Sequence, residues 1–184
     1  MAQTEQQTSF SMRGVRFDQM MRYEHIMHTI PPVYDENSRV LILGTMPSPK
    51  SREVHFYYGN PQNRFWRVLA AVRGEELPRS TEEKTEFLRR SRIALWDTLA
   101  SCDITGAADS SIKNAVPNDL RVILDAADIK KIFTTGKTAF KYYCRYQFAQ
   151  TGIEAVCLPS PSPANARVSL AELIEEYKII NHYL

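Results

Sequence analysis

The chain has 184 residues, of which 43% are hydrophobic and 24% are charged, as is usual for a globular protein with a substantial core. Lysine and arginine number 23 against 21 aspartates and glutamates, and this net charge of +2 argues against a protein that coats nucleic acid, although a local basic surface remains possible. No apolar run approaches the roughly 20 residues of a membrane helix. The polar start, MAQTEQQT, predicts no secretory signal, so we expect a cytoplasmic protein.

The amino-terminal segment differs in composition from the rest of the chain. Residues 1–22 are rich in Gln, Thr and Ser and predict a flexible tail, whereas residues 23–184 predict a single domain. His25 and His28 lie next to this tail and are interpreted as surface residues. No spacing of histidines or of the three cysteines is typical of a metal site, so we expect neither metal nor cofactor.

Strand and helix patterns alternate along the domain. Four continuous apolar runs predict strands buried on both faces: Val40–Leu43, Ile93–Trp96, Lys131–Thr134 and Ala155–Leu158. Helical patterns lie between and after these strands. Apolar stripes predict a helix over Phe65–Val72 and another that carries Phe140, Tyr143, Cys144 and Phe148 and ends at Gly152. Capping residues predict three more: Ser80 and Glu83 form a capping box for a helix to Arg90, Asn118 caps a helix at Asp119–Ala127, and Ser169 and Glu172 form a capping box for the last helix. This order predicts a three-layer α/β/α sandwich with a four-stranded, mainly parallel sheet.

Ligands of such sheets bind at the edge where the parallel strands end. The segments that follow the four strands are 44–49 (GTMPSP), Asp97, 135–138 (TGKT) and 159–165 (PSPSPAN). Proline fixes φ, so the first and last of these loops are stiff and suit the walls of a preformed site. Gly136, Lys137 and Thr138 do not form a nucleotide-binding phosphate loop, because Lys131 stands where that motif needs glycine.

Residues 50–73 interleave five basic residues with several aromatic residues. Such a pattern suits a nucleic-acid surface, in which cations meet phosphates and rings stack on bases. The alternative is that Phe65 and Trp66 belong to the core side of a helix.

Four segments together resemble a known family. They are VLILGTMP at Val40–Pro47, YYGNPQNRFW at Tyr57–Trp66, ALWD at Ala94–Asp97 and LPSPSPAN at Leu158–Asn165. In order and spacing, residues 31–167 resemble the uracil-DNA glycosylase superfamily, most closely its hypoxanthine-DNA (deoxyinosine) glycosylase branch. The resemblance implies a DNA-repair enzyme that flips a deaminated base out of DNA and hydrolyses its bond to deoxyribose, leaving an abasic site.

The resemblance also implies roles for individual residues. Asn63 would orient the attacking water, although the same residue type suits a helix N-cap, and both roles are compatible. Tyr58 would stack on the flipped base and Asp97 would contact its edge, as acceptor or donor. The backbone of Gly44, Thr45 and Met46 would line the base pocket. DNA-backbone contacts would come from Ser160 and Ser162, and phosphate contacts from Arg64, Lys137 and Arg167.

Two departures from uracil-specific relatives leave alternatives open. Met46 and Leu158 stand where those relatives carry polar residues that act on water or on the leaving base. We therefore expect a monomeric, monofunctional glycosylase acting first on hypoxanthine in DNA, associated with the nucleoid if the source is bacterial. The alternatives are a uracil- or mismatch-directed glycosylase and a catalytically silent DNA-binding module.

Overall fold

The computed structural model describes residues 23–184, and the tail predicted at residues 1–22 lies outside them. A four-stranded parallel sheet forms the centre, in the order β3-β2-β6-β7. Its strands are β2 (Val40–Gly44), β3 (Ile93–Asp97), β6 (Lys131–Thr135) and β7 (Ala155–Leu158). All four were predicted, because an apolar run covered on both faces needs no alternation. Every residue of β2 and β3 is buried.

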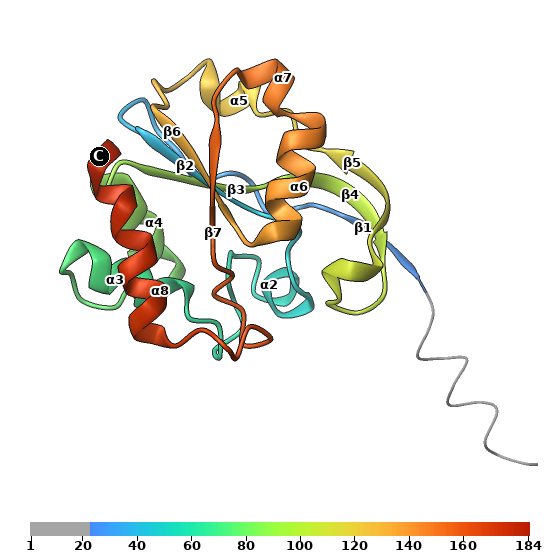
Figure 1. The fold of residues 1–184 in the computed structure, drawn as a ribbon, viewed down its shortest axis with the longest axis horizontal. Helices are drawn as coiled ribbons and strands as arrows, with labels where there is room; N and C mark the ends of the chain where they lie inside the picture. Colours follow the sequence, from blue (N-terminus) through green and yellow to red (C-terminus); the bar gives the residue numbers. More distant parts are fainter. Residues whose placement is uncertain (1–22) are drawn as a thin grey trace, which may run out of the picture.

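Helices cover both faces of the central sheet (Figure 1), which confirms the predicted α/β/α layers. The helices α3, α4 and α8 gather on one side, and α6 and α7 lie on the other. The helix bounds are α2 (Pro49–Glu53), α3 (Phe65–Arg73), α4 (Thr81–Arg90), α5 (Arg121–Leu124), α6 (Lys137–Tyr146), α7 (Phe148–Thr151) and α8 (Leu170–Tyr177), with the 3-10 helices η1 (Asp109–Ser111) and η2 (Lys178–Tyr183).

Local sequence signals account for most helix ends. Both predicted capping boxes are present: Ser80 with Glu83 opens α4, and Ser169 with Glu172 opens α8. Helix α7 ends at Gly152, which has a φ of +65° that glycine adopts without strain. The apolar stripe of α3 is buried as predicted, so Phe65 and Trp66 belong to the core.

Two helix predictions were wrong in detail. Asn118 does not cap a helix over Asp119–Ala127. Its amide instead donates to the carbonyls of Asp97 and Leu99, at 2.9 and 3.0 Å, and the helix is the short α5. In α6 and α7 the predicted stripe is only partly buried: Cys144 and Phe148 are exposed, whereas the buried side chains of α6 are Ala139, Tyr142 and Tyr143.

A second, three-stranded antiparallel sheet was not predicted. Its strands are β1 (Glu24–Met27), β4 (Leu99–Ile104) and β5 (Lys113–Pro117), in the order β1-β4-β5. Strand β4 follows β3 after a single residue, Thr98, so this sheet extends from the carboxyl end of the central one. It places the segment after β1 beside the end of β3.

Candidate active site

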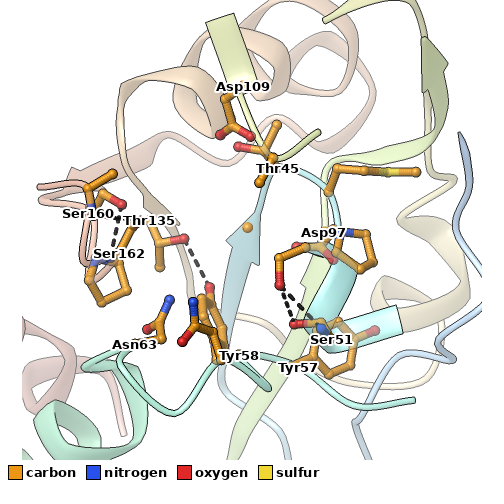
Figure 2. A pocket seen from close by; sticks show the side chains of 18 of the residues that line it. Thr45, Ser51, Tyr57, Tyr58, Asn63, Asp97, Asp109, Thr135, Ser160 and Ser162 are labelled. Carbon is orange, nitrogen blue, oxygen red and sulfur yellow. Dashed lines mark hydrogen bonds between the residues drawn. The ribbon is translucent and has the colours of Figure 1, made fainter. Parts of the chain in front are cut away.

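A pocket of about 630 Å³ opens where the parallel strands end. Gly44 ends β2, Asp97 ends β3 and Thr135 ends β6, and all three line the pocket (Figure 2). The remaining walls come from the loops at 45–48 and 160–165, from residues 51–52, 57–63 and 104–109, and from Ile26. The two proline-rich loops therefore lie at one site, as the strand ends suggested.

Most of the predicted site residues meet in this pocket. Those that line it are Gly44, Thr45, Met46, Tyr58, Asn63, Asp97, Ser160 and Ser162. Arg64, Lys137 and Arg167 do not. Leu158 is buried and does not line the pocket, so its lack of a polar group does not change the pocket surface.

Asp97 occupies the floor of the pocket beside Gly44. A Cβ atom on Gly44 would come within 2.2 Å of Asp97 Oδ1 and 3.4 Å of the Tyr58 hydroxyl. Position 44 must therefore be glycine for the carboxylate and the phenol to approach the strand end together. The other carboxylate oxygen, Oδ2, accepts a hydrogen bond from Nε2 of His28 at 2.8 Å.

Tyr58 is fixed from two sides. Its hydroxyl lies 2.9 Å from Thr135 Oγ1, and its ring stacks on Phe65 at a centroid distance of 3.7 Å and an angle of 14°. Phe65 covers one ring face, so a ligand could stack only on the opposite face. Burial, and then the charge of Asp97, raise the pKa of Tyr58 well above its usual value, so the hydroxyl stays neutral. Its φ of +51° is strained for a non-glycine residue, as is common at functional sites.

Asn63 supports the start of α3 and also lines the pocket, whereas the water-orienting role implied for it stays a prediction. Its Oδ1 accepts a hydrogen bond from the backbone N–H of Phe65 at 3.0 Å, so the side chain satisfies one of the free N–H groups at the start of α3. Arg64, rather than Asn63, is the formal N-cap residue. Within residues 23–184 the Nδ2 group of Asn63 has no hydrogen-bond partner, and the side chain lines the pocket.

Arg64 holds the loop at 160–165 in place. Its guanidinium donates to backbone carbonyls of that loop and its continuation: Pro161 at 3.4 Å, Ser162 at 3.0 Å, Asn165 at 2.9 Å, and Val168. These contacts connect the start of α3 to the pocket wall that carries Ser160 and Ser162. The predicted phosphate contact of Arg64 stays a prediction, and the structure adds a supporting role.

Lys137 and Arg167 are both exposed, outside the pocket. Lys137 lines a neighbouring cavity that also contains Glu172 and Glu176. Their phosphate contacts stay predictions. Arg52 is one of the five basic residues of 50–73 and was given no individual site role, yet it is the one basic side chain among the described residues that line the main pocket.

The sequence interpretation gave no site role to two titratable residues here. His28 was interpreted as a surface residue, but its side chain is only 2% exposed. No local pattern indicates this, because the burial depends on β1 pairing with the distant β4. Asp109, at the start of η1, faces the pocket beside Thr45 (Figure 2). Burial raises the pKa of Asp109, and the charge of Asp97 adds to the rise.

The described residues contain neither a metal-binding cluster nor a membrane-spanning helix. No group of three His, Cys, Asp or Glu side chains within 23–184 could hold a metal ion. In the same residues, no helix is long and apolar enough to cross a membrane.

This α/β/α protein brings an amide, an aromatic ring and a carboxylate together in one pocket at the end of a parallel sheet, a set of groups that can hold a flat, polar ring. Residues 31–183 match the family model of the uracil DNA glycosylase superfamily. The chain belongs to this superfamily, which confirms the resemblance noted in the sequence.

Individual relatives agree with this assignment. The chain is 37% identical to a hypoxanthine DNA glycosylase of Methanosarcina barkeri over 139 residues, covering 74% of this chain and 87% of the relative. It is 35% identical to the protein of the same name from Methanosarcina acetivorans over 159 residues, covering 85% and 99%. A solution NMR structure from Methanosarcina acetivorans, 33% identical, superimposes with a TM-score of 0.70 over 85% of this chain and 99% of the other.

Proposed function

We propose that this protein is a monofunctional DNA glycosylase of base-excision repair that releases deaminated bases, hypoxanthine first. One observation carries the proposal. The amide of Asn63, the ring of Tyr58 and the carboxylate of Asp97 line a single pocket at the carboxyl end of the sheet. The relatives named hypoxanthine DNA glycosylase support the choice of substrate.

The pocket suits a base that has left the DNA stack. At about 630 Å³ it lies within the range of small-molecule sites and has room for a purine. The base would stack on the free face of Tyr58, lie against the backbone of 44–46 and present an edge to Asp97. Ser160 and Ser162, on the opposite wall, would contact the DNA backbone.

Asn63 would act by positioning water, since an amide is too weak a base to remove a proton. Phe65 uses one of the two lone pairs of Oδ1, so the other lone pair and both Nδ2 hydrogens are free to hold a water molecule. The water oxygen bonds to C1′ of the sugar while the bond from C1′ to the base nitrogen breaks. The bond electrons leave with the base, which gains a proton, and the attacking water loses one.

One feature supports a monofunctional enzyme. No lysine is among the described residues that line the pocket, so a covalent Schiff base followed by strand cleavage is not expected.

A single-turnover assay tests this proposal. Excess protein is incubated with labelled oligonucleotides that contain one hypoxanthine or one uracil, and alkali then breaks the abasic sites. We expect product from hypoxanthine and little from uracil. Uracil as the main substrate would favour the uracil-directed alternative. Binding without product from either oligonucleotide would favour the silent DNA-binding module.

A further inference from the structure

His28 lies behind the pocket floor and has no role in the function proposed above. It follows β1, and its backbone N–H donates to the carbonyl of Ala100 at 2.8 Å. Its imidazole packs edge-on against Trp96 and beside Tyr57, with ring centroids 6.4 and 6.2 Å away. The ring is therefore held by both backbone and core contacts.

This buried ring contacts the carboxylate that faces the pocket. Nε2 of His28 lies 2.8 Å from Asp97 Oδ2, and the two side chains are 2% and 7% exposed. Within residues 23–184, His28 is the only basic side chain paired with Asp97. A buried carboxylate needs such a partner, because burial without one is costly.

The two oxygens of Asp97 thus face different neighbours. Oδ2 is engaged by His28, whereas Oδ1 is the atom that lies above Gly44. A second contact holds the backbone of the same residue, since Asn118 donates to the Asp97 carbonyl at 2.9 Å. With Oδ2 engaged by His28, Oδ1 is the oxygen of Asp97 that is left to accept a hydrogen bond from a ligand.

We propose that His28 is a positioning residue that fixes Asp97 so that Oδ1 accepts the ring N–H of a deaminated base. The inference rests on the proposed glycosylase function and names its substrate class. Deamination of adenine or cytosine replaces a ring nitrogen lone pair with an N–H, at N1 of hypoxanthine and N3 of uracil. A fixed acceptor therefore binds the deaminated base, and it meets a lone pair on the undamaged parent.

Such an arrangement discriminates strongly between a deaminated base and its undamaged parent. A site built to pair with a polar group rejects an analogue that lacks it, because the buried partner is left without a hydrogen bond. The pairing would exclude adenine and cytosine, the normal parents of the two deaminated bases, without requiring a contact with the keto oxygen.

Two amide substitutions at position 28 separate positioning from general structural damage. The amide nitrogen of glutamine can reach the place of Nε2, whereas that of asparagine is too short and lies near the place of Nδ1. We expect His28→Asn to slow single-turnover release of hypoxanthine by roughly 10- to 100-fold, the effect of losing one hydrogen bond to a charged group. His28→Gln should recover most of the rate.

A matched control, His25, lies in strand β1, three residues before His28. His25 also pairs with an aspartate, Asp103, at 2.7 Å, but its side chain is 59% exposed and does not line the pocket. His25→Asn should release hypoxanthine at the wild-type rate. All the variants should keep the wild-type affinity for DNA with an abasic-site analogue, which has no base to contact Asp97.

The outcomes are distinguishable. If the wild-type protein releases no hypoxanthine, the proposed function itself fails. If the wild-type protein releases hypoxanthine and His28→Asn releases it as fast as His25→Asn, the positioning role is overturned. Thermal unfolding and abasic-site binding show whether His28→Asn has lost its fold. If His28→Asn does not fold, the variant Asp97→Asn tests the inference instead. His28 would hold the amide oxygen of the new asparagine, so that the amide N–H₂ group would face the base. A lower ratio of hypoxanthine to adenine release supports the inference, and an unchanged ratio overturns it.

Discussion

Asn63 and Phe65 are joined by a hydrogen bond of 3.0 Å from the Phe65 backbone N–H to Asn63 Oδ1, so the residue proposed to hold water also begins helix α3. Substitution by alanine would remove both roles at once. A loss of activity in Asn63→Ala is thus ambiguous unless stability is measured with it. Aspartate keeps the oxygen acceptor for Phe65 and removes the Nδ2 donor.

We expect Asn63→Ala to abolish base release and to lower the free energy of unfolding by about 0.5–2 kcal/mol, the usual cost of losing a helix cap. Asn63→Asp should keep near-wild-type stability but still lose most of its activity. Urea denaturation and single-turnover assays on both variants check this. Full activity of Asn63→Asp would show that Oδ1 alone positions the water.

Arg64 provides the second prediction, because it joins α3 to the loop at 160–165. Arg64→Met leaves several carbonyls without their donor, so we expect a loss of about 2–4 kcal/mol in stability and faster amide hydrogen exchange in the loop. Base release should slow as the loop loosens. Arg67→Met is the control, since Arg67 lies on the same helix and is exposed. Equal exchange in both variants would contradict the supporting role.

The sequence predicted the central sheet well and the second sheet not at all, for a physical reason. The strands of the central sheet are continuous apolar runs, visible in any short window. Strands β1 and β5 have the sequences EHIM and KNAVP and are largely exposed, so they carry no comparable signal. The pairing of β1 with β4, moreover, joins residues about 75 positions apart, such as Met27 and Ser101.

The same reason explains which site residues were found. Asn63, Tyr58 and Asp97 lie in motifs that the resemblance identified, and each lines the pocket. The burial of His28 depends on the second sheet, so this residue was missed. The contacts of Arg64 reach residues about 100 positions further along the chain, and no local rule predicts them.

Tyr57 and Tyr58 are adjacent but should respond differently to substitution. Both residues line the pocket, but Tyr57 is buried and its hydroxyl donates to the carbonyls of Ile30 and Pro31, whereas the Tyr58 ring is only partly buried. Tyr57→Phe should lower stability by about 1 kcal/mol and leave base release nearly unchanged. Tyr58→Ala should slow base release by roughly 10- to 100-fold through lost stacking, and Tyr58→Phe should keep most of the rate. Equal losses in Tyr58→Phe and Tyr58→Ala would show that the hydroxyl matters, not the ring.

Asp109 gives a prediction about pH. Its pKa is raised above the ordinary 3.8, first by burial and then by the charge of Asp97. A carboxyl whose pKa is higher in the folded state binds its proton more tightly there. Its ionisation therefore costs stability as the pH rises from 3.8 through the folded-state pKa, and the cost remains in full at neutral pH.

Asp109→Asn removes that cost, so the variant should unfold at a higher temperature than wild type at pH 7. The difference should shrink as the pH falls and vanish below 3.8, where both folded and unfolded forms of the wild-type carboxyl are protonated.

Asp119→Asn is a control of opposite sign, because the pKa of the exposed Asp119 is lowered to about 2, chiefly by hydrogen bonds from Arg121. Thermal unfolding between pH 3 and 8 measures both. A variant at position 109 that is less stable than wild type at pH 7 would mean that the ionised carboxylate is stabilised by its surroundings. If Asp109→Asn gains stability but loses base release, the carboxyl of Asp109 contributes to activity and lowers the stability of the folded protein.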